Sequence, residues 1–255
     1  MRSRRLGRSL GINLTPANIK LCSFNCTYCQ YGWSGTLRHP ELIELERWPG
    51  PAAVARAVSR ALKVLAGRGE SIDRLTLAGH GEPTLHPRFP EVVRELIAVR
   101  NAHASRVPLA ILSNASTLDR SEILETIRRL DERYMKLDAG DAAMLRSVNG
   151  AQVPFEQIMA GLQALPDLTV QAMFVRDRTG RVDNTTEMAV IRWVTALQRI
   201  KPREVHIYTI DRAPAWPYLQ PVSAARLQEI AQRVRQAGIP CTAFGQGRTG
   251  GPARS

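Results

Sequence analysis

The stretch "RLTLAGHGEPTLHPRFPEVVRELIAVRNA" (residues 74–102) contains the signals of a strand, a turn and a helix in succession. The strand candidate RLTLAG (74–79) is short and rich in leucine. From residue 88 onward, apolar residues recur at three- and four-residue spacing, which is typical of a helix that packs on a sheet. Glycine and proline separate the two segments. The stretch therefore predicts one βα unit.

The same pattern repeats in both directions along the chain. Further strand candidates are SLGINL (9–14), PLAILSN (108–114), RYMKLDA (133–139), LTVQAMFV (168–175), EVHIYTI (204–210) and the weaker PCTAFG (240–245). Helix candidates cover residues 51–67, 88–102, 119–130, 154–165, 185–200 and 223–238. Six βα repeats predict parallel strands with right-handed crossovers, as an open doubly wound sheet or as a complete or partial barrel. No segment has the composition of a linker, so we expect a single domain over residues 1–255.

The composition is that of a folded protein. Hydrophobic residues make up 44% and charged residues 23% of the 255 residues, which argues against wholesale disorder. No apolar run approaches the roughly 20 residues that cross a bilayer, and the basic start has too short an apolar stretch for a signal peptide. We therefore expect a soluble cytoplasmic protein with no membrane partner. The sequence leaves the oligomeric state open.

The charge balance is strongly basic. Lysine and arginine number 35 against 23 acidic residues, giving a net charge of +12 and a pI near 10.4. Such a charge attracts polyanions, so nucleic acid is a candidate partner. The excess is spread along the chain, however, and a solvated basic surface explains it at least as well.

Three of the four cysteines fall in "LCSFNCTYCQYG" (21–32), inside a long loop predicted over about residues 15–49. This loop follows the first strand, and ligands of parallel α/β proteins collect at the carboxyl ends of the strands. Thiolates are soft ligands for zinc or iron–sulfur clusters. Three thiolates from Cys22, Cys26 and Cys29 are one too few for a closed zinc site, unless Cys241 or a histidine completes it. Chance core residues are the third interpretation, and for the lone Cys241 a buried core position is favoured.

Two further strand ends carry groups suited to a ligand. Gly79-His80-Gly81-Glu82-Pro83 follows its strand directly; its glycines permit close backbone approach to a ligand, and its proline fixes the exit direction. An ordinary βα turn is the alternative. Ser113 and Asn114 offer short polar groups for a ribose or a carboxylate, or else serve as a loop or helix cap.

Two later strands place polar side chains on one face. Lys136 and Asp138 share a face by alternation, as Gln171 does with Met173. A charged pair in a buried strand is costly unless it is paired or bound to a ligand, and we favour a cofactor pocket over a structural salt bridge.

The last strong strand supplies candidates for the substrate side: His206, Tyr208, Asp211 and Arg212. An interior histidine is the alternative for His206. No catalytic residue is identified.

The spacing C-x3-C-x2-C, with Tyr28 before the last cysteine, resembles the signature of the radical S-adenosylmethionine (radical SAM) superfamily. The resemblance implies a partial (β/α)6 TIM-like barrel in which Cys22, Cys26 and Cys29 hold a [4Fe-4S] cluster. It further implies that the free iron binds S-adenosylmethionine (SAM), whose reductive cleavage gives a 5′-deoxyadenosyl radical that abstracts a substrate hydrogen. The turn at 79–83 is similar to the G-G-E-P motif of the superfamily, with His80 in place of the second glycine. The residues expected at SAM are Tyr28, Gly79, His80, Gly81, Glu82, Pro83, Ser113, Asn114, Lys136, Asp138 and Gln171.

A wider likeness extends from residue 9 to about 214. The runs "GHGEPTLHP", "KLDAG", "VDNTTE" and "IYTIDRAPA" resemble radical SAM proteins related to the tRNA wybutosine-synthesis enzyme. That enzyme carries additional cysteines near its amino terminus, whereas the first fourteen residues here contain none. The likeness implies a tRNA base as the favoured substrate and an external one-electron reductant. Glycyl-radical-activating or small-metabolite enzymes are the alternatives, and a zinc-binding non-catalytic protein is the second alternative. We expect a flexible tail over residues 246–255.

Overall fold

A computed structural model describes residues 2–3, 7–17, 19–34 and 43–245 of the chain. The strands are β1 (Arg2–Ser3), β2 (Gly7–Ile12), β3 (Arg74–Leu77), β4 (Leu109–Ser113), β5 (Glu132–Lys136), β6 (Thr169–Asp177), β7 (Glu204–Thr209), β8 (Leu219–Pro221) and β9 (Cys241–Phe244). The α-helices are α1 (Pro51–Gly67), α2 (Phe89–His103), α3 (Ser121–Arg128), α4 (Ala142–Asn149), α5 (Phe155–Ala164), α6 (Glu187–Ile200) and α7 (Ala224–Gln236). The tail expected over 246–255 and part of the long loop predicted over about residues 15–49 lie outside the described residues.

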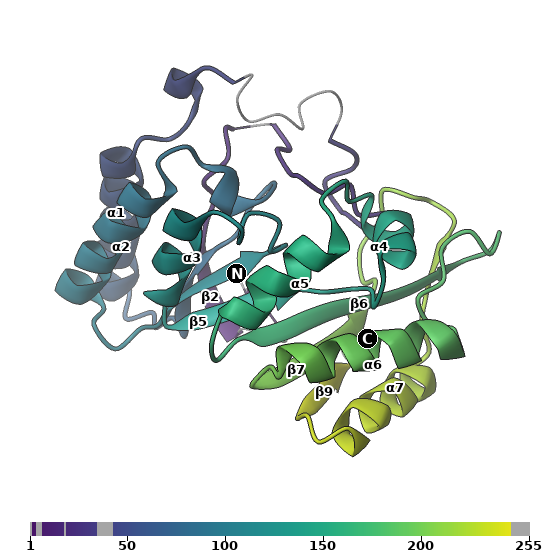
Figure 1. Cartoon of the computed structure of the whole chain (residues 1–255). Helices are drawn as coiled ribbons and strands as arrows, with labels where there is room; N and C mark the ends of the chain where they lie inside the picture. Colours follow the sequence, from purple (N-terminus) through teal and green to yellow (C-terminus); the bar gives the residue numbers. More distant parts are fainter. Residues whose placement is uncertain (1, 4–6, 18, 35–42, 246–255) are drawn as a thin grey trace, which may run out of the picture.

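The strands form one sheet in the order β1-β2-β3-β4-β5-β6-β7-β9, which follows their order in the chain. Neighbours from β2 to β9 are parallel, while β1 pairs antiparallel with β2 and β8 pairs antiparallel with the end of β6. The sheet curls into a half-barrel with helices along its outer side (Figure 1). The predicted partial barrel is therefore confirmed, and each strand and helix candidate corresponds to an element.

Among the described strands and α-helices, three were not predicted: α4, β1 and β8. Helix α4 has only 8 residues, although its start and stop signals are present in the sequence. The Asp141 side chain accepts from the N–H of Met144, and Gly150 ends the helix with a φ of 54°. The start predicted for α3 at Asp119 is wrong, because the helix begins at Ser121 after a residue with no capping side chain.

Alternation gives the sheet two chemically different faces. The outer face is apolar and packs under the helices; in β7, for example, Val205 and Ile207 are fully buried in the main core. Helix α6 adds Trp193, whose indole N–H donates to Leu137 O at 2.8 Å and whose ring lies 5.0 Å from that of Phe174. The inner face is mostly polar; beside Met173, its members in three neighbouring strands are Glu132, Tyr134, Lys136, Thr169, Gln171, Glu204, His206 and Tyr208.

Cys241 belongs to the main core, as predicted. It opens β9 and pairs with Val205 near the start of β7, so it lies at the amino-terminal edge of the sheet. The three clustered cysteines follow the carboxyl end of β2, at the opposite edge. Burial raises the pKa of the Cys241 thiol to about 12. Cys241 therefore cannot complete a metal site with the other three.

Within the described residues, no helix combines the length and apolar character that spanning a membrane requires.

Candidate cofactor site

The cysteine loop, residues 19–34, follows β2 and docks on the end of α4 (Figure 1). The N–H of Asn25 donates to Asn149 O at 2.8 Å, and the N–H of Thr27 donates to Val148 O at 2.9 Å. A helix far along the chain therefore holds the loop at the carboxyl ends of the strands.

Two of the clustered thiols are enclosed by the fold. Burial raises the pKa of the Cys22 thiol well above its ordinary value, and it also raises the pKa of Cys26. The Asp138 carboxylate adds to the shift at Cys26, whereas hydrogen bonds from Tyr28 and Asn149 lower that pKa. Since the metal ligand is the thiolate, a bound cation would have to stabilise the deprotonated form.

The turn after β3 is packed directly on the cysteine loop. The N–H of Glu82 donates to Leu21 O at 2.9 Å, and a Cβ at Gly81 would lie 1.7 Å from that same oxygen. A Cβ at Gly79 would lie 1.9 Å from Asn13 Oδ1. Both glycines are therefore required by close approach, and this approach is to the protein's own loops.

His80 fits between these glycines. Its N–H donates to Asn13 Oδ1 at 3.1 Å, and its ring packs edge-on against Tyr31 with 4.7 Å between ring centroids. The backbone thus makes the contact and the imidazole lies against the cysteine loop. Pro83 then opens the short 3-10 helix Pro83–Leu85.

Glu82 joins the turn to the end of β4. Its buried carboxylate accepts from Thr84 Oγ1 at 2.7 Å, from Ser113 Oγ at 2.8 Å and from the N–H of Asn114 at 2.6 Å. Burial raises the pKa of Glu82, and these hydrogen bonds oppose the shift. The structure thus brings together three of the residues that the sequence predicts at the cofactor, with the Glu82 and Ser113 side chains bonded to each other.

Asn114 reaches the cysteine loop. Its Nδ2 donates to Ser23 Oγ at 3.0 Å and to Cys22 Sγ at 3.5 Å, while its Oδ1 accepts from the N–H of Ser116 at 3.0 Å. The amide is therefore fixed with its nitrogen toward the cysteine.

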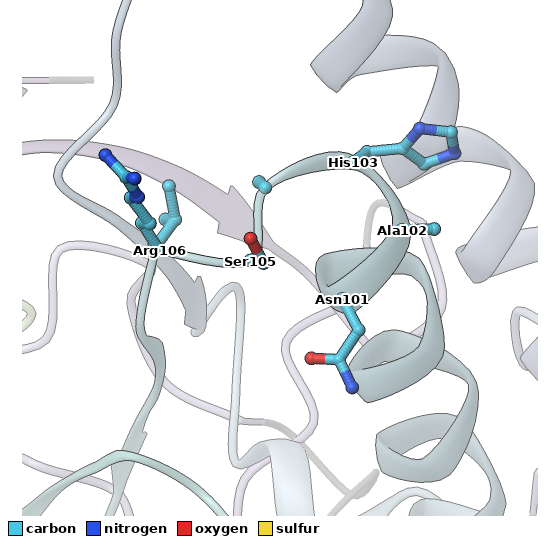
Figure 2. A pocket seen from close by; sticks show the side chains of 7 residues that line it. Asn101, Ala102, His103, Ser105 and Arg106 are labelled. Carbon is cyan, nitrogen blue, oxygen red and sulfur yellow. The ribbon is translucent and has the colours of Figure 1, made fainter.

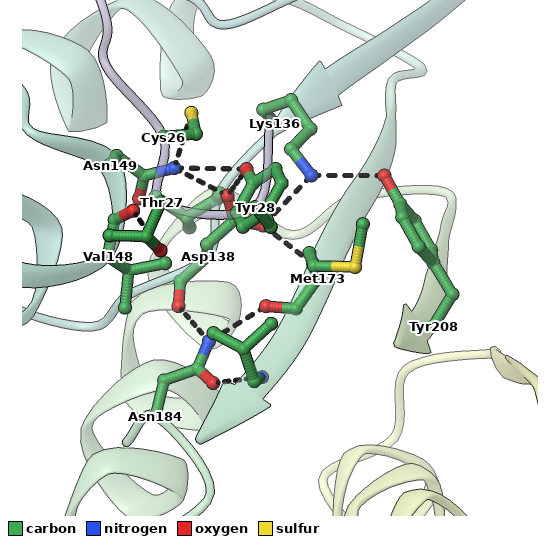
Figure 3. A network of polar contacts seen from close by, with 12 residues as sticks. Cys26, Thr27, Tyr28, Lys136, Asp138, Val148, Asn149, Met173, Asn184 and Tyr208 are labelled. Atoms are coloured by element: carbon green, nitrogen blue, oxygen red, sulfur yellow. Dashed lines mark hydrogen bonds and ion pairs between the residues drawn. The ribbon is translucent and has the colours of Figure 1, made fainter. Parts of the chain in front are cut away.

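Lys136 and Asp138 form an ion pair at the centre of the site, with Lys136 Nζ 3.1 Å from Asp138 Oδ1 (Figure 3). Lys136 Nζ also donates to Tyr208 OH at 3.0 Å and lies 4.8 Å and 4.9 Å from the centroids of the Tyr28 and Tyr208 rings. Burial lowers the pKa of Lys136, but the Asp138 carboxylate together with Tyr208 and Cys26 outweighs this effect, so the pKa is raised and the side chain is cationic. Tyr28 OH donates to Asp138 Oδ2.

Two asparagines that sequence reasoning missed complete this network (Figure 3). Asn149 Nδ2 donates to Asp138 Oδ2 at 2.6 Å and to Cys26 Sγ at 3.2 Å. Asn184 Nδ2 donates to the carbonyl oxygens of Asp138 at 2.9 Å and Met173 at 2.8 Å. Asn184 lies in the run "VDNTTE", which signalled the family resemblance, whereas no local pattern marks Asn149.

The change Asp138→Asn should lower the free energy of unfolding by about 3 kcal/mol, because it leaves the Lys136 cation without its carboxylate partner in a buried site. Urea denaturation followed by circular dichroism measures this. The matched control is Glu156→Gln, which removes an exposed partner of Arg199 and should leave the urea midpoint unchanged. Equal midpoints for the two variants would contradict a central role for the ion pair.

The other expected residues lie along the inner face. Gln171 is in register with Lys136 on β5 and with His206 on β7. His206 lies two residues before Tyr208 on the same face of β7, nearer the amino-terminal edge of the sheet. Its Nε2 is 3.2 Å from a Glu204 carboxylate oxygen, and its ring centroid is 5.2 Å from that of Phe244. Tyr208 therefore joins the Lys136 network, whereas His206 contacts Glu204 and Phe244.

Asp211 and Arg212 are exposed in the loop after β7. Arg212 donates to Gln30 of the cysteine loop. The same loop contains Trp216, whose backbone N–H donates to Thr27 O at 2.8 Å. This segment therefore forms a wall beside the cysteines.

A surface hollow of about 350 Å³ lies elsewhere, lined by residues 101–107 (Figure 2). These residues lead from the end of α2 into the start of β4, at the edge of the sheet opposite the cysteine loop. The hollow contributes nothing to the site.

The donor set fits an iron–sulfur cluster with one open position. One short loop supplies Cys22, Cys26 and Cys29, and amide N–H groups are directed at two of the three sulfurs. Hydrogen bonds to cluster sulfurs are a recognised feature of iron–sulfur proteins. Within the described residues, no three histidine, cysteine or acidic side chains gather as the ligands of a single metal ion.

Residues 19–177, from the cysteine loop to the end of β6, match the model of the radical SAM superfamily. The chain belongs to the radical SAM superfamily. The match covers the clustered cysteines, the turn at 79–83 and the Lys136–Asp138 ion pair, whereas Asn184 and Tyr208 lie beyond it.

Similar proteins are found among both curated sequences and solved structures. UPF0026 protein MJ1312 of Methanocaldococcus jannaschii is 29% identical over 86% of this chain, and UPF0026 protein slr1464 of Synechocystis is 32% identical over 80%. The chain spans 64% and 71% of those two proteins, respectively. A radical SAM methyltransferase from Sphaerobacter thermophilus superposes with a TM-score of 0.69 at 15% identity, covering 96% of this chain and 68% of the other, which shows the shared fold.

The expected nearness to the wybutosine-synthesis enzyme is not confirmed. Archaeal TYW1 superposes with a TM-score of 0.53 at 13% identity, over 90% of this chain and 72% of the other, which shows the fold alone. The UPF0026 proteins MJ1312 and slr1464 are more similar to this chain in sequence, at 29% and 32% identity.

Proposed function

We propose that this radical SAM protein is an enzyme in which Cys22, Cys26 and Cys29 hold a [4Fe-4S] cluster whose fourth iron binds SAM. The main support is the close approach of Gly81 to Leu21 O, where a Cβ would lie 1.7 Å from the oxygen. This close approach packs the turn at 79–83 directly on the cysteine loop. A cluster held by these three cysteines would supply the electron for reductive cleavage of SAM, the radical chemistry by which a hydrogen atom would be removed from the substrate.

The residues of the chain would position the reactants. The Lys136 ammonium has three N–H donors, and Asp138 and Tyr208 accept two of them. Its remaining donor and its positive charge suit a carboxylate or another anionic group of the cofactor or the substrate. The polar inner face of the half-barrel would orient that substrate close to the radical.

Anaerobic reconstitution with iron and sulfide tests the enzyme proposal. We expect a four-iron absorption band and, after addition of a reductant and SAM, 5′-deoxyadenosine detected by chromatography. Absence of the four-iron absorption band, or of 5′-deoxyadenosine, would overturn the proposal and favour the zinc-binding alternative.

For the substrate we propose a base of RNA, with tRNA as the first candidate, and for the electron source an external one-electron donor. Support comes from a basic rim beside the cysteine loop, defined by the exposed residues Arg146, Arg176, Arg178, Arg181 and Arg212. No carboxylate of the described residues forms an ion pair with these five. Some exposed arginines on other surfaces are paired, as Arg88 is with Glu91, so what distinguishes the rim is that its arginines lie together beside the cysteine loop.

Aromatic rings accompany the basic rim. Tyr218 is half exposed, and its ring centroid lies 5.2 Å from that of Trp216. Trp216 Nε1 in turn donates to Asp177 Oδ2 at 3.3 Å, at the end of β6 between two arginines of the rim. Guanidinium groups for phosphates and an exposed ring for base stacking are the two elements of single-stranded nucleic-acid binding.

A charge-matched pair of variants tests the RNA substrate. Changing Arg176, Arg178 and Arg181 to alanine should weaken tRNA binding and make the slope of log K against log salt less steep by about 3. The control removes the same charge elsewhere, with alanine at Arg94, Arg128 and Arg199, each paired with a glutamate. Filter binding at several salt concentrations gives both slopes. If the unmodified protein binds no tRNA at low salt, the RNA proposal is wrong.

A further inference from the structure

We infer that Asn149 and Asn114 each donate an N–H···S hydrogen bond to a cluster thiolate and thereby raise the reduction potential of the cluster. The inference rests on the proposed function, because it requires the cluster on the three cysteines. Asn149 Nδ2 lies 3.2 Å from Cys26 Sγ, and Asn114 Nδ2 lies 3.5 Å from Cys22 Sγ. Among the described residues, Cys29 receives no such amide.

The orientation of the Asn149 amide is fixed by its neighbours. Its Nδ2 is 2.6 Å from Asp138 Oδ2 and 3.1 Å from Tyr28 OH. A carboxylate only accepts hydrogen bonds, so the nitrogen of the amide must face it. The side chain is 1% exposed, and the backbone carbonyl of the same residue accepts from Asn25 of the cysteine loop. Asn149 therefore holds both the loop and one of its sulfurs.

The orientation of the Asn114 amide is fixed from its other end. Its Oδ1 accepts from the N–H of Ser116, so the oxygen cannot face the cysteine. The backbone N–H of Asn114 donates to the buried carboxylate of Glu82 at 2.6 Å, which fixes the backbone at this position. Two asparagines on different elements, each held by separate partners, thus present donors to two different sulfurs.

Such donors act on the charge of the cluster. One-electron reduction adds a negative charge that is shared with the thiolates, and N–H dipoles directed at sulfur stabilise it. The effect is larger in a buried site than in water, because the surroundings screen it less. Removing one of these hydrogen-bond donors should therefore shift the reduction potential of the cluster to a more negative value. The cluster would then be harder to reduce with a given electron donor.

The test is the midpoint potential of the reconstituted cluster in Asn149→Ala and Asn114→Ala, measured by mediated redox titration and electron paramagnetic resonance. Both potentials should be more negative than that of the unmodified protein, with the larger shift for Asn149→Ala, whose hydrogen bond is shorter. The control is Asn101→Ala at the exposed end of α2, which should leave the potential unchanged. Unchanged potentials in both site variants, with full cluster content, would overturn the inference.

A second measurement applies if a variant fails to hold its cluster. In the unmodified protein with ¹⁵N-labelled asparagine, the reduced cluster should show hyperfine coupling to ¹⁵N nuclei and to protons that exchange in D₂O. Absence of this coupling would overturn the inference even without variants. A cluster that forms 5′-deoxyadenosine but lacks the coupling contradicts only the asparagine roles, whereas failure of the unmodified protein to assemble a cluster contradicts the proposed function as well.

Discussion

Cys26→Ala should abolish both the four-iron absorption band and the formation of 5′-deoxyadenosine. Three thiolates bind three of the four irons and leave one iron open. Of the three, Cys26 is the thiolate that Tyr28 and Asn149 contact directly. With two thiolates left, the cluster loses a protein ligand and SAM has no stable iron to bind. Absorbance after anaerobic reconstitution and chromatography of the reaction products measure the two losses.

Cys241→Ala is the matched control, since it removes the same side chain from the opposite edge of the sheet. It should keep full cluster content and 5′-deoxyadenosine formation, while costing some stability because Cys241 packs in the core. Retention of the cluster in Cys26→Ala, or its loss in Cys241→Ala, would contradict the assignment of the ligands.

Gly81→Ala should have the second largest effect, a loss of about 3 kcal/mol in the free energy of unfolding together with poor cluster retention. The new Cβ would lie 1.7 Å from Leu21 O, which is backbone and cannot turn aside. The turn and the cysteine loop would have to separate, breaking the bond from Glu82 N to the same oxygen. Chemical denaturation measures the stability, and iron content after gel filtration measures retention.

Gly67→Ala is the matched control for Gly81→Ala, because it makes the same glycine-to-alanine change at a position without close packing. Gly67 is the last residue of α1, and a Cβ there would meet nothing within 4 Å. Alanine at this position should be neutral or stabilise the protein by up to about 1 kcal/mol. If Gly81→Ala were equally harmless, the close packing of the turn on the cysteine loop would not matter for the site.

The fold was predictable because its signals are local. Each strand candidate from SLGINL to PCTAFG is bounded by turn residues, and each long helix shows its apolar period. Helix α4 is too short for a period to stand out, so only its caps, Asp141 and Gly150, could have revealed it. The curvature of the sheet comes from the packing of all its strands, and the βα repeats alone left open and closed arrangements equally possible.

Parts of the candidate site could be proposed from the sequence where a motif marks the residues. The cysteine spacing and the position of the turn at 79–83 were sufficient to choose those residues, and alternation placed Lys136 and Asp138 together. Asn149 could not be found in this way, because an asparagine at a helix end usually serves as a cap. Its contact with Cys26 arises only when α4 packs on the cysteine loop.

The polar inner face of the half-barrel has a consequence for how the chain finds its fold. A slip of one residue in the pairing of β5 would turn Glu132, Tyr134 and Lys136 toward the apolar layer beneath the helices. It would also remove Met135 from that layer, where it is fully buried. Charges that line the site therefore also penalise misaligned strands, so the residues that suit a substrate help select the single alignment in which the site exists.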